Sequence, residues 1–563
     1  MTQLVSSAAT PSTSHVNVAR RLTAMAERQG EAIAIVVPQR GRRDGRRNYD
    51  TFTFRQLDDE SNRLARGLRD WGVTPGTRVA LLVRPGIEFI SLVFALLKAG
   101  AVTVLVDPGM GRKNLIRCLA EAEPDGFIAV PPVQAVRAVL HSKFPRARFN
   151  VTVGRRVFWG GLTLDELRRR GSSERFCHDT SGDDPAAIIF TTGSTGPPKG
   201  VLYRHTNFDC QVTQLQEFYG ITPGEIDVAA FPLFGLFNAA LGVTAVIPDM
   251  DPSHPAKVNP RNIVEAVHDW QATQAFGSPA VWNVVGPYCQ EQNIRLPTLR
   301  RLLSAGAPVP PHVLERMKAV IADAGDIHTP YGATEALPVA SIAASEVLSE
   351  TRQLWARGGG TCVGRRFSGI EWKVIETVDG PVPRLSEVVA LPNGQIGELI
   401  VSGNVVTRQY ATRKEANSLA KIPDGSRVWH RMGDVGYLDD HDRFWYCGRM
   451  AHRVRTVEGD MFTIPCEAIF NQHPDVFRSA LVGIGPAIHQ RPVVIVEPWP
   501  GRMPRSRAER DKFVGELSEL ARANPLTADI HDFLFHASMP VDIRHNSKIF
   551  REKLAEWAAA KLR

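Results

Sequence analysis

The chain has 563 residues and a formal net charge of +8, with 43% hydrophobic and 22% charged residues. This composition is that of a globular protein, and the length predicts more than one domain. No apolar run approaches the roughly 18 residues of a membrane-spanning helix, which argues against a membrane span. Residues 1–18, rich in Ser, Thr and Ala, are expected to form a disordered tail and not a signal peptide.

Basic residues are dispersed along the chain, and no patch of alternating basic and aromatic residues predicts nucleic-acid binding. The densest basic cluster lies in a turn-like stretch with glycine and leaves two interpretations open, a solvated loop or a contact with a polyanion or membrane surface. It comprises Arg40, Arg42, Arg43, Arg46 and Arg47. The seven cysteines are widely spaced and lack a Cys-x-x-Cys motif, so a reduced, cytoplasmic protein without a disulfide framework or zinc site is predicted.

Regular elements are predicted in chain order from about residue 57. Apolar residues at helical spacing between 57 and 71 predict a helix that stops at Gly72. A strand at 78–83, a helix at 89–98 and a strand at 101–106 follow, an order typical of a right-handed crossover between parallel strands. A comparable unit is expected further along, with a helix near 206–217 and strands near 226–231 and 274–277.

Residues 190–200 read Phe-Thr-Thr-Gly-Ser-Thr-Gly-Pro-Pro-Lys-Gly and follow the apolar run at 186–189. Glycines let a backbone approach an oxyanion closely, hydroxyls donate to it, and a lysine adds positive charge. Because a strand precedes the loop, a phosphate-binding loop is preferred over a solvated turn. The candidate phosphate ligands are Thr191, Thr192, Gly193, Ser194, Thr195, Gly196 and Lys199.

This loop is not an ordinary P-loop. The pattern G-x-x-x-x-G-K-[ST], counted from Gly193, requires a second glycine where Pro198 stands. Gly200 follows the lysine, so no hydroxyl is available there to hold a magnesium ion. The loop instead resembles the signature of the AMP-forming adenylating enzymes, a superfamily of acyl-CoA synthetases, peptide-synthetase adenylation domains and beetle luciferases.

Residues 331–335, Tyr-Gly-Ala-Thr-Glu, match a second motif of that superfamily about 140 residues later. The resemblance implies that Tyr331 stacks on adenine and that Gly332 allows the chain to pass close to the nucleotide. It implies that Thr334 donates to the α-phosphate and that Glu335 is a ligand of Mg²⁺. Thr191, Thr334 and Glu335 are therefore candidate catalytic residues.

Two further segments match the nucleotide site of the superfamily. Residues 304–308 resemble the loop on the adenine face, with Gly306, Ala307 and Pro308 as candidates, although a plain strand-to-helix turn is the alternative. The resemblance implies that Asp434 accepts both ribose hydroxyls, for which a carboxylate suits a diol, and that Arg449 also reaches the ribose. Asp439 and Asp440 are interpreted as hairpin-turn residues, without a functional role.

Residues 540–548 match the motif of the C-terminal lysine, Lys548. The resemblance implies that this lysine contacts the carboxylate and α-phosphate as the adenylate forms. The alternative is a solvated lysine that opens a helix with Phe550, Leu554 and Trp557 on one face. The superfamily fold implied is α/β, with two α/β subdomains and a small β-barrel in residues 19–447 and a mobile α+β lid in 448–563.

The substrate region departs from the superfamily pattern. Gly235 stands where relatives carry histidine, which predicts room for a bulkier acyl group, and Gly277 is a further pocket candidate. The phenylalanines Phe231, Phe234 and Phe237 line this pocket or belong to the core, and the sequence leaves both open. No acidic residue lies in 231–247 to hold a substrate ammonium group, which argues against an amino-acid substrate.

Two elements that serve thioester formation in relatives are also altered. Ala451 stands at the hinge where Asp or Lys is usual, and residues 455–459 replace the usual lysine-glycine loop. We therefore do not expect coenzyme A as a cofactor, whereas ATP and Mg²⁺ are expected. A long-chain acyl-CoA synthetase or acyl-AMP ligase remains the enzyme alternative, and a non-catalytic nucleotide-binding scaffold the alternative of another class.

The full motif set resembles the β-lactone synthetases of bacterial long-chain olefin biosynthesis. That resemblance implies a 2-alkyl-3-hydroxy fatty acid as substrate, with attack by its own 3-hydroxyl on the acyl-AMP. Other enzymes of the olefin pathway, a β-lactone decarboxylase and a 3-keto acid reductase, are possible partners by the same resemblance. His205 and His545 are candidate bases for the hydroxyl, and structural roles for both remain open.

Overall fold

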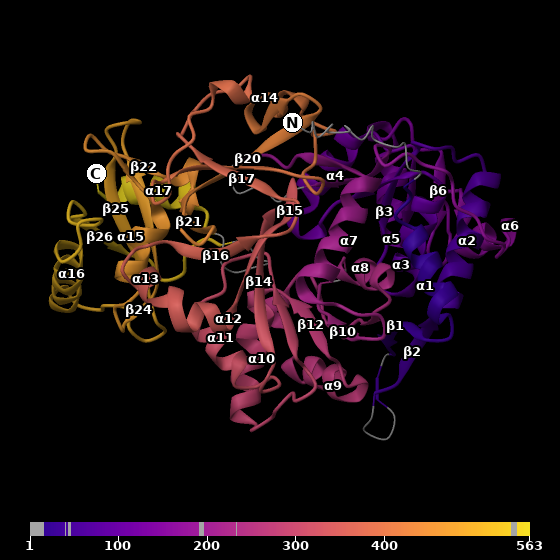
Figure 1. The fold of residues 1–563 in the computed structure, drawn as a ribbon, viewed down its shortest axis with the longest axis horizontal. Helices are drawn as coiled ribbons and strands as arrows, with labels where there is room; N and C mark the ends of the chain where they lie inside the picture. The colour runs from indigo at the N-terminus through magenta and orange to yellow at the C-terminus, as the bar shows by residue number, and fades with distance from the viewer. Residues whose placement is uncertain are drawn as a thin grey trace, which may run out of the picture.

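The fold was analysed in a computed structural model that describes residues 16–39, 41–42, 47–190, 196–231, 233–541 and 549–562. Helices and strands from the N-terminal three quarters of the chain form the broad body of the molecule in Figure 1. The C-terminal elements, coloured orange to yellow, form a separate smaller part on the left of that view. The predicted α/β class with a smaller C-terminal part is confirmed.

The first sheet has the strand order β7-β6-β5-β3-β4-β8-β9. All of its neighbours are parallel except β8 and β9, which form an antiparallel hairpin around the phosphate-loop segment. The predicted crossover between the strands near 78 and 102 is confirmed. The strands are β3 (Arg78–Leu82), β4 (Val102–Leu105), β5 (Gly126–Ala129), β6 (Phe149–Thr152), β7 (Leu162–Thr163), β8 (Pro185–Phe190) and β9 (Gly200–Arg204).

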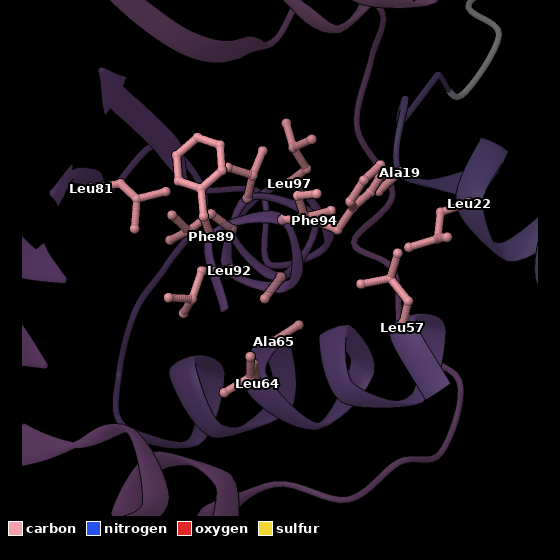
Figure 2. Close-up of a cluster of buried hydrophobic side chains, with 14 of the residues drawn as sticks. Ala19, Leu22, Leu57, Leu64, Ala65, Leu81, Phe89, Leu92, Phe94 and Leu97 are labelled. Carbon is pink, nitrogen blue, oxygen red and sulfur yellow. The ribbon is translucent and has the colours of Figure 1, made fainter. Parts of the chain in front are cut away.

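Six helices belong to this N-terminal region: α1 (Arg20–Gln29), α2 (Phe54–Asp70), α3 (Ile87–Lys98), α4 (Arg112–Ala122), α5 (Pro131–Val139) and α6 (Leu164–Arg170). Helix α2 begins with a capping box, in which the Thr53 hydroxyl accepts from the Gln56 amide. Figure 2 shows Leu57 and Leu64 of this helix facing Phe89, Leu92 and Phe94 of α3 in a buried cluster. The apolar residues whose spacing predicted the helix thus pack on one side of this core.

The second sheet begins as a parallel α/β unit in which β14, β13, β12, β10, β11 and β1 are successive neighbours, with β2 antiparallel to β1. The predicted helix near 206–217 and strands near 226 and 274 are confirmed as α7, β10 and β12. The strands of this part are β1 (Ile33–Pro38), β2 (Tyr49–Thr53), β10 (Ile226–Ala229), β11 (Thr244–Val246), β12 (Gln274–Gly277), β13 (Arg301–Ser304) and β14 (Asp326–Ala333). Its helices are α7 (His205–Tyr219), α8 (Phe234–Leu241), α9 (Pro260–Trp270), α10 (Pro279–Glu291) and α11 (Pro311–Lys318).

From β14 onward the same sheet is antiparallel and follows the order β14-β15-β16-β21-β20-β18-β17, with β19 beside β20. This section corresponds in position to the small barrel that the family resemblance implies. Its strands are β15 (Ala336–Ala343), β16 (Thr361–Arg366), β17 (Glu371–Ile375), β18 (Gly397–Ser402), β19 (Lys421–Asp424), β20 (Arg427–Leu438) and β21 (Arg443–Arg449). The short helices α12 (Ala344–Glu346), α13 (Arg352–Ala356) and α14 (Asn417–Ala420) lie in its connections.

The C-terminal part contains a small hairpin and a three-stranded sheet of order β24-β25-β26. The proposed domain boundary at 447/448 falls within β21. Lys548 lies outside the described residues, and helix α17 begins three residues after it, so the expectation that this lysine opens the helix is corrected. The elements are β22 (Val454–Arg455), β23 (Asp460–Met461), α15 (Thr463–Phe470), β24 (Val476–Ile484), β25 (Arg491–Pro498), α16 (Arg507–Arg522), β26 (Asp532–Phe535) and α17 (Arg551–Lys561).

Three remaining sequence expectations concern the surface and the chain start. The guanidinium of Arg42 bonds both carboxylate oxygens of Glu265, and Arg47 pairs with Asp249 at 2.8 Å, so these two arginines are held in intramolecular ion pairs. The other three arginines of that cluster lie outside the described residues. Asn17 and Val18, predicted to belong to the tail, are buried, and residues 1–15 are not described. Every helix in the described parts of the chain is too short or too polar to cross a bilayer.

Candidate active site

Tyr331, Asp434 and Arg449, which lie far apart in the sequence, meet at one carboxylate. The Tyr331 hydroxyl donates to one oxygen of Asp434 at 2.5 Å, and the Arg449 guanidinium donates to the other at 2.6 Å. Burial, with the Asp434 charge beside it, raises the pKa of Tyr331 far above its usual value. Attraction to Asp434 raises the pKa of Arg449. Each carboxylate oxygen retains a lone pair, which fits the proposed acceptor role toward a diol.

Strand pairing explains how Asp434 and Arg449 come together. They are direct partners across the antiparallel strands β20 and β21, and Gly433 takes a left-handed φ of +64° just before the aspartate. Gly332, next to Tyr331, is equally constrained, since a Cβ there would lie 2.6 Å from the Ala336 carbonyl oxygen. Gly433 thus provides a left-handed turn and Gly332 a close approach to the chain at Ala336, whereas the approach of Gly332 to a nucleotide stays a prediction.

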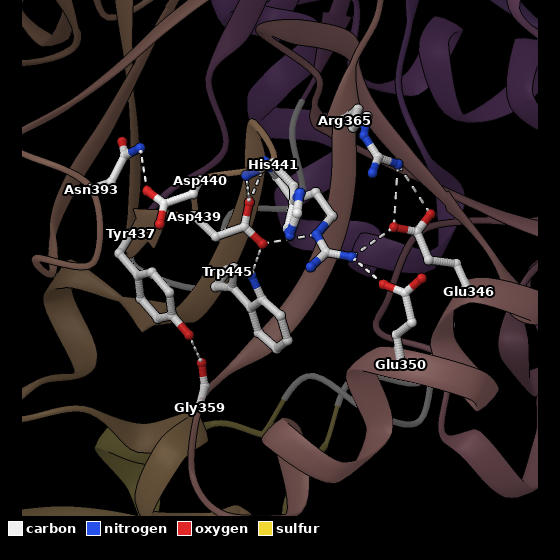
Figure 3. Close-up of polar contacts among 11 residues, drawn as sticks. Glu346, Glu350, Gly359, Arg365, Asn393, Tyr437, Asp439, Asp440, His441 and Trp445 are labelled. Carbon is white, nitrogen blue, oxygen red and sulfur yellow. Dashed lines mark hydrogen bonds and ion pairs between the residues drawn. The ribbon is translucent and has the colours of Figure 1, made fainter.

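The turn of the β20–β21 hairpin is tied to the body of the protein, as Figure 3 shows. Asp439 accepts from the Arg443 side chain and from the Trp445 indole, both at 2.8 Å. Arg443 also reaches Glu346 at 2.9 Å and Glu350 at 2.8 Å in the segment after β15. The hairpin-turn prediction for Asp439 is confirmed, but its role in anchoring the strand pair of Asp434 was missed.

Thr334 and Glu335 are fixed by two tyrosines that the sequence interpretation did not single out. The Tyr203 hydroxyl on β9 donates to the Thr334 carbonyl at 2.5 Å, and the Tyr410 hydroxyl donates to the Glu335 carboxylate at 2.7 Å. The amide and hydroxyl of Thr407 both donate to the Glu335 carbonyl, at 2.9 and 3.0 Å. The loop that carries Thr407 and Tyr410 thus bonds both the backbone carbonyl and the side-chain carboxylate of Glu335, the proposed magnesium ligand.

Two lysines approach the ring of Tyr410. The Lys199 ammonium of the phosphate loop lies 4.9 Å from the ring centroid, and that of Lys421 lies 5.9 Å from it. Burial lowers the pKa of Lys421 to about 7, against the attraction of Glu335. Burial also raises the pKa of Tyr410, which keeps its hydroxyl a hydrogen-bond donor. The phosphate loop, the Glu335 motif and strand β19 therefore converge on one aromatic ring.

A single protein carboxylate is a suitable site for Mg²⁺, which usually binds one or two carboxylates together with substrate phosphates and water. Glu335 fits this requirement, because it lies beside Lys199 of the phosphate loop through Tyr410. In the described ranges, no group of three or more His, Cys, Asp or Glu side chains could hold a metal on its own. The Glu335 carboxylate therefore suits a Mg²⁺ ion whose other ligands come from a nucleotide and water.

The loop after β13 lies at the same sheet edge as Tyr331. The register that pairs Leu303 with His328 on the parallel neighbour β14 brings residues 305–308 beside the Tyr331 segment. Gly306 is exposed there with a φ of +98°. The candidates Gly306, Ala307 and Pro308 thus follow the strand that pairs with β14, which carries Tyr331, and their place on the adenine face stays a prediction. Thr191, Thr192, Gly193, Ser194, Thr195 and Lys548 lie outside the described residues.

The phenylalanines of the substrate region pack against one another. Phe234 stacks on Phe276 with ring centroids 4.1 Å apart, and Phe231 and Phe237 each lie 5.8 Å from a ring of this pair. Phe234 is buried, whereas Phe231 and Phe237 are partly exposed and pack against the cluster that also contacts Tyr331. Phe234 therefore belongs to the core, and Phe231 and Phe237 lie at the border of the same cluster.

The two glycines predicted for this pocket face elsewhere. A Cβ at Gly235 would point at Ile90, 3.3 Å away, and one at Gly277 would meet the Trp282 ring at 2.7 Å. The side of each glycine on which a Cβ would stand therefore faces the packed interior. The room expected from the missing side chain at Gly235 does not lie among the phenylalanines, because the helix turns this position toward the core.

The altered hinge and loop have clear structures. Ala451 lies in the short turn η7 (Met450–His452) after β21, and residues 456–459 form the tight turn between β22 and β23. Arg453 and Arg455 both bond Asp379, at 2.6 and 2.9 Å, which joins the start of the C-terminal part to the N-terminal body.

His205, proposed as a base, is fully buried at the start of α7, where its Nδ1 accepts from the Val18 amide at 3.4 Å. Burial lowers its pKa to about 4. This environment indicates a structural role. His545 lies outside the described residues.

The fold and this nucleotide constellation define an adenylate-forming enzyme. The sequence profile described as AMP-binding enzyme matches residues 22–411, and the chain belongs to that family. It is 46% identical over 550 residues to an olefin beta-lactone synthetase of Xanthomonas campestris pv. campestris, covering 96% of this chain and 97% of the relative. It is 44% identical to an olefin beta-lactone synthetase of Stenotrophomonas maltophilia, covering 97% and 98%. ATP-bound MatB from Rhodopseudomonas palustris shares the fold, with a TM-score of 0.77 at 20% identity over 97% and 99% of the two chains.

Proposed function

We propose that this chain activates a 2-alkyl-3-hydroxy fatty acid with ATP and closes it to a β-lactone in olefin biosynthesis. The observation that carries the proposal is the 44–46% identity to two olefin beta-lactone synthetases over nearly the full length of all three chains. The convergence of Tyr331, Asp434 and Arg449 supports the nucleotide half of that chemistry.

In the first step, a carboxylate oxygen of the acid attacks the α-phosphorus of ATP, and the bond to the β-phosphate breaks to release pyrophosphate. Asp434 and Arg449 orient the ribose, and Thr334 donates to the α-phosphate. Glu335 would hold Mg²⁺, which neutralises charge on the triphosphate when bound. Lys548 stabilises the charge that develops at the α-phosphate as the bond forms.

In the second step, the 3-hydroxyl oxygen of the substrate attacks its own acyl carbon. The acyl–phosphate bond breaks, AMP leaves with the bonding electron pair, and the hydroxyl proton is lost to solvent or a base. An oriented intramolecular attack can contribute roughly 7–11 kcal/mol relative to a bimolecular one, which offsets the strain of the four-membered ring. The product is the acid less one water.

Coenzyme A takes no part in these two reaction steps. The hinge position Ala451 and the short turn at 456–459 support this, because both differ from the elements that serve thioester formation in relatives. The free cysteines of the described chain are compatible with a cytoplasmic location, which we also propose. Enzymes that form the 3-hydroxy acid and consume the lactone, such as a 3-keto acid reductase and a β-lactone decarboxylase, would be its functional partners.

The proposal is tested by product analysis with ATP, Mg²⁺ and matched acids, with and without coenzyme A. A 2-alkyl-3-hydroxy acid should give AMP, pyrophosphate and a neutral product lighter than the acid by one water. The matched acid without the 3-hydroxyl should stall as the adenylate or hydrolyse slowly. Equal turnover of both acids, or a thioester from either, would make the chain an acyl-CoA synthetase instead.

A further inference from the structure

The buried side chain of Lys421 has no role in the chemistry described above. It lies on β19, is 7% exposed, and is the strand partner of His430 on β20, four residues before Asp434. Burial of a lysine is costly unless its ammonium is compensated by nearby polar or charged groups. The groups around this ammonium therefore indicate why the residue is a lysine.

The hydrogen bonds and the ring contact of the Lys421 ammonium lead toward Glu335. The ammonium donates to the Thr407 carbonyl and lies 3.4 Å from the Thr407 hydroxyl. That hydroxyl and the amide of the same threonine hold the Glu335 carbonyl. The ammonium also faces the ring of Tyr410, whose hydroxyl holds the Glu335 carboxylate. One side chain thus stabilises both supports of the proposed magnesium ligand.

The charge of Lys421 matches this position. Burial lowers the pKa of Lys421, the attraction of Glu335 opposes that shift, and Lys199 on the other approach to Tyr410 adds to it. Two lysine side chains and one glutamate therefore gather around a single tyrosine. The negative charge of an incoming triphosphate favours the protonated form of such lysines.

We propose that Lys421 is a positioning residue that acts through Thr407 and Tyr410 to aim the Glu335 carboxylate at the metal-bound triphosphate. The inference rests on the proposed adenylation chemistry, but its test requires no acyl substrate. Loss of a group that supports a metal ligand typically weakens metal binding about 10- to 100-fold. Lys421 should therefore matter for ATP bound with Mg²⁺ and much less for ATP alone.

The test is titration calorimetry of the full-length protein with ATP, in Mg²⁺ and in EDTA. Lys421→Met and Tyr410→Phe should each weaken binding about 10- to 100-fold in Mg²⁺ and change it little in EDTA. The double variant should lose less than the product of the single losses, because both side chains act through Glu335. Tyr219→Phe is the matched control, since that buried hydroxyl bonds Ser341 and not Glu335.

Equal losses in Mg²⁺ and EDTA, or no loss in either, would overturn the proposal. If Lys421→Met does not fold, Lys421→Gln takes its place in the same comparison, because it keeps a polar side chain at this buried position and removes the ammonium group. These outcomes are separate from failure of the proposed function. A wild-type protein that binds ATP with Mg²⁺ but forms no lactone would contradict the overall reaction and leave the binding comparison intact.

Discussion

At the scale of single residues, Asp434 offers the most direct test of the nucleotide site. Its carboxylate joins Tyr331 and Arg449, and the ribose contact proposed for it would be present in both the ground state and the transition state. Asp434→Ala should therefore raise the apparent KM for ATP about 10- to 100-fold, the range for a lost hydrogen bond to a charged group. Steady-state kinetics at saturating acid measures this effect.

The informative control is Tyr331→Phe, which removes one donor to Asp434 but leaves the carboxylate and the aromatic ring in place. We expect a smaller change in KM for this variant. A collapse of kcat in Asp434→Ala at unchanged KM for ATP would contradict a ribose-binding role.

The buried histidine His205 predicts a dependence of stability on pH. Its folded-state pKa of about 4 lies below the ordinary 6.5, so between these values the unfolded chain binds a proton that the folded chain does not. The contribution of His205 to the free energy of unfolding should thus fall by at most about 3 kcal/mol as the pH drops from 6.5 to 4, and this contribution should stay constant above 6.5.

Denaturant unfolding of His205→Gln at pH 7 and pH 4.5 measures this contribution. The glutamine can still accept from the Val18 amide but does not titrate, so the variant should lose less stability on acidification than the wild type. Identical pH dependence in both proteins would show that His205 does not titrate as its burial indicates.

At the scale of elements, the ion pairs of Asp379 connect the body to the start of the C-terminal part. The Asp379 side chain is 59% exposed, and exposed pairs contribute about 0–1 kcal/mol each, so Asp379→Ala should leave thermal stability nearly unchanged. Because it removes the bonds of Arg453 and Arg455 to the body and leaves their ion pairs with Asp460, it should increase amide hydrogen exchange between 450 and 460. Asp379→Glu, which keeps the charge, is the control. Unchanged hydrogen exchange in the alanine variant would show that these ion pairs do not restrict the motion of residues 450–460.

The regular elements were the most predictable part of the fold. Periodicity near residues 57–71 and alternation of apolar strands with helices gave α2, β3, α3 and β4 within a few residues, because local spacing determines them. The nucleotide motifs were equally readable, since Tyr331 and Asp434 stand in short glycine-containing patterns. These signals are local in sequence and need no knowledge of the tertiary structure.

The supports of the site were not predictable in the same way. Tyr203, Tyr410 and Lys421 stand in ordinary strand and loop sequences, and only the packing of β9, β19 and the loop at 403–413 brings them to Glu335. The direction in which Gly235 faces was likewise predicted wrongly. Neighbouring positions on a helix point to different sides, so a shift of one residue decides whether a position faces the pocket or the core. Such choices depend on long-range contacts.

At the scale of the whole molecule, the proposed reaction divides the work between body and lid. In the proposed reaction, Asp434 and Glu335 of the body would bind the ribose and the metal, whereas Lys548 of the C-terminal part would act in the first step only. Since the nucleophile of the second step is the substrate's own hydroxyl, no second substrate such as coenzyme A has to enter the site between the two steps. The two half-reactions should therefore respond differently when the lid lysine is removed.

Lys548→Ala should lower turnover from ATP and acid about 100- to 1,000-fold, the cost of one transition-state donor, with the KM for ATP changed little. The same variant, given the chemically synthesised acyl-adenylate of a 2-alkyl-3-hydroxy acid, should release AMP and lactone at close to the wild-type rate. Wild-type protein with the same adenylate, and the adenylate in buffer alone, set the upper and lower limits. If the variant fails equally with the preformed adenylate, the lysine serves ring closure as well, and the division of labour between body and lid is wrong.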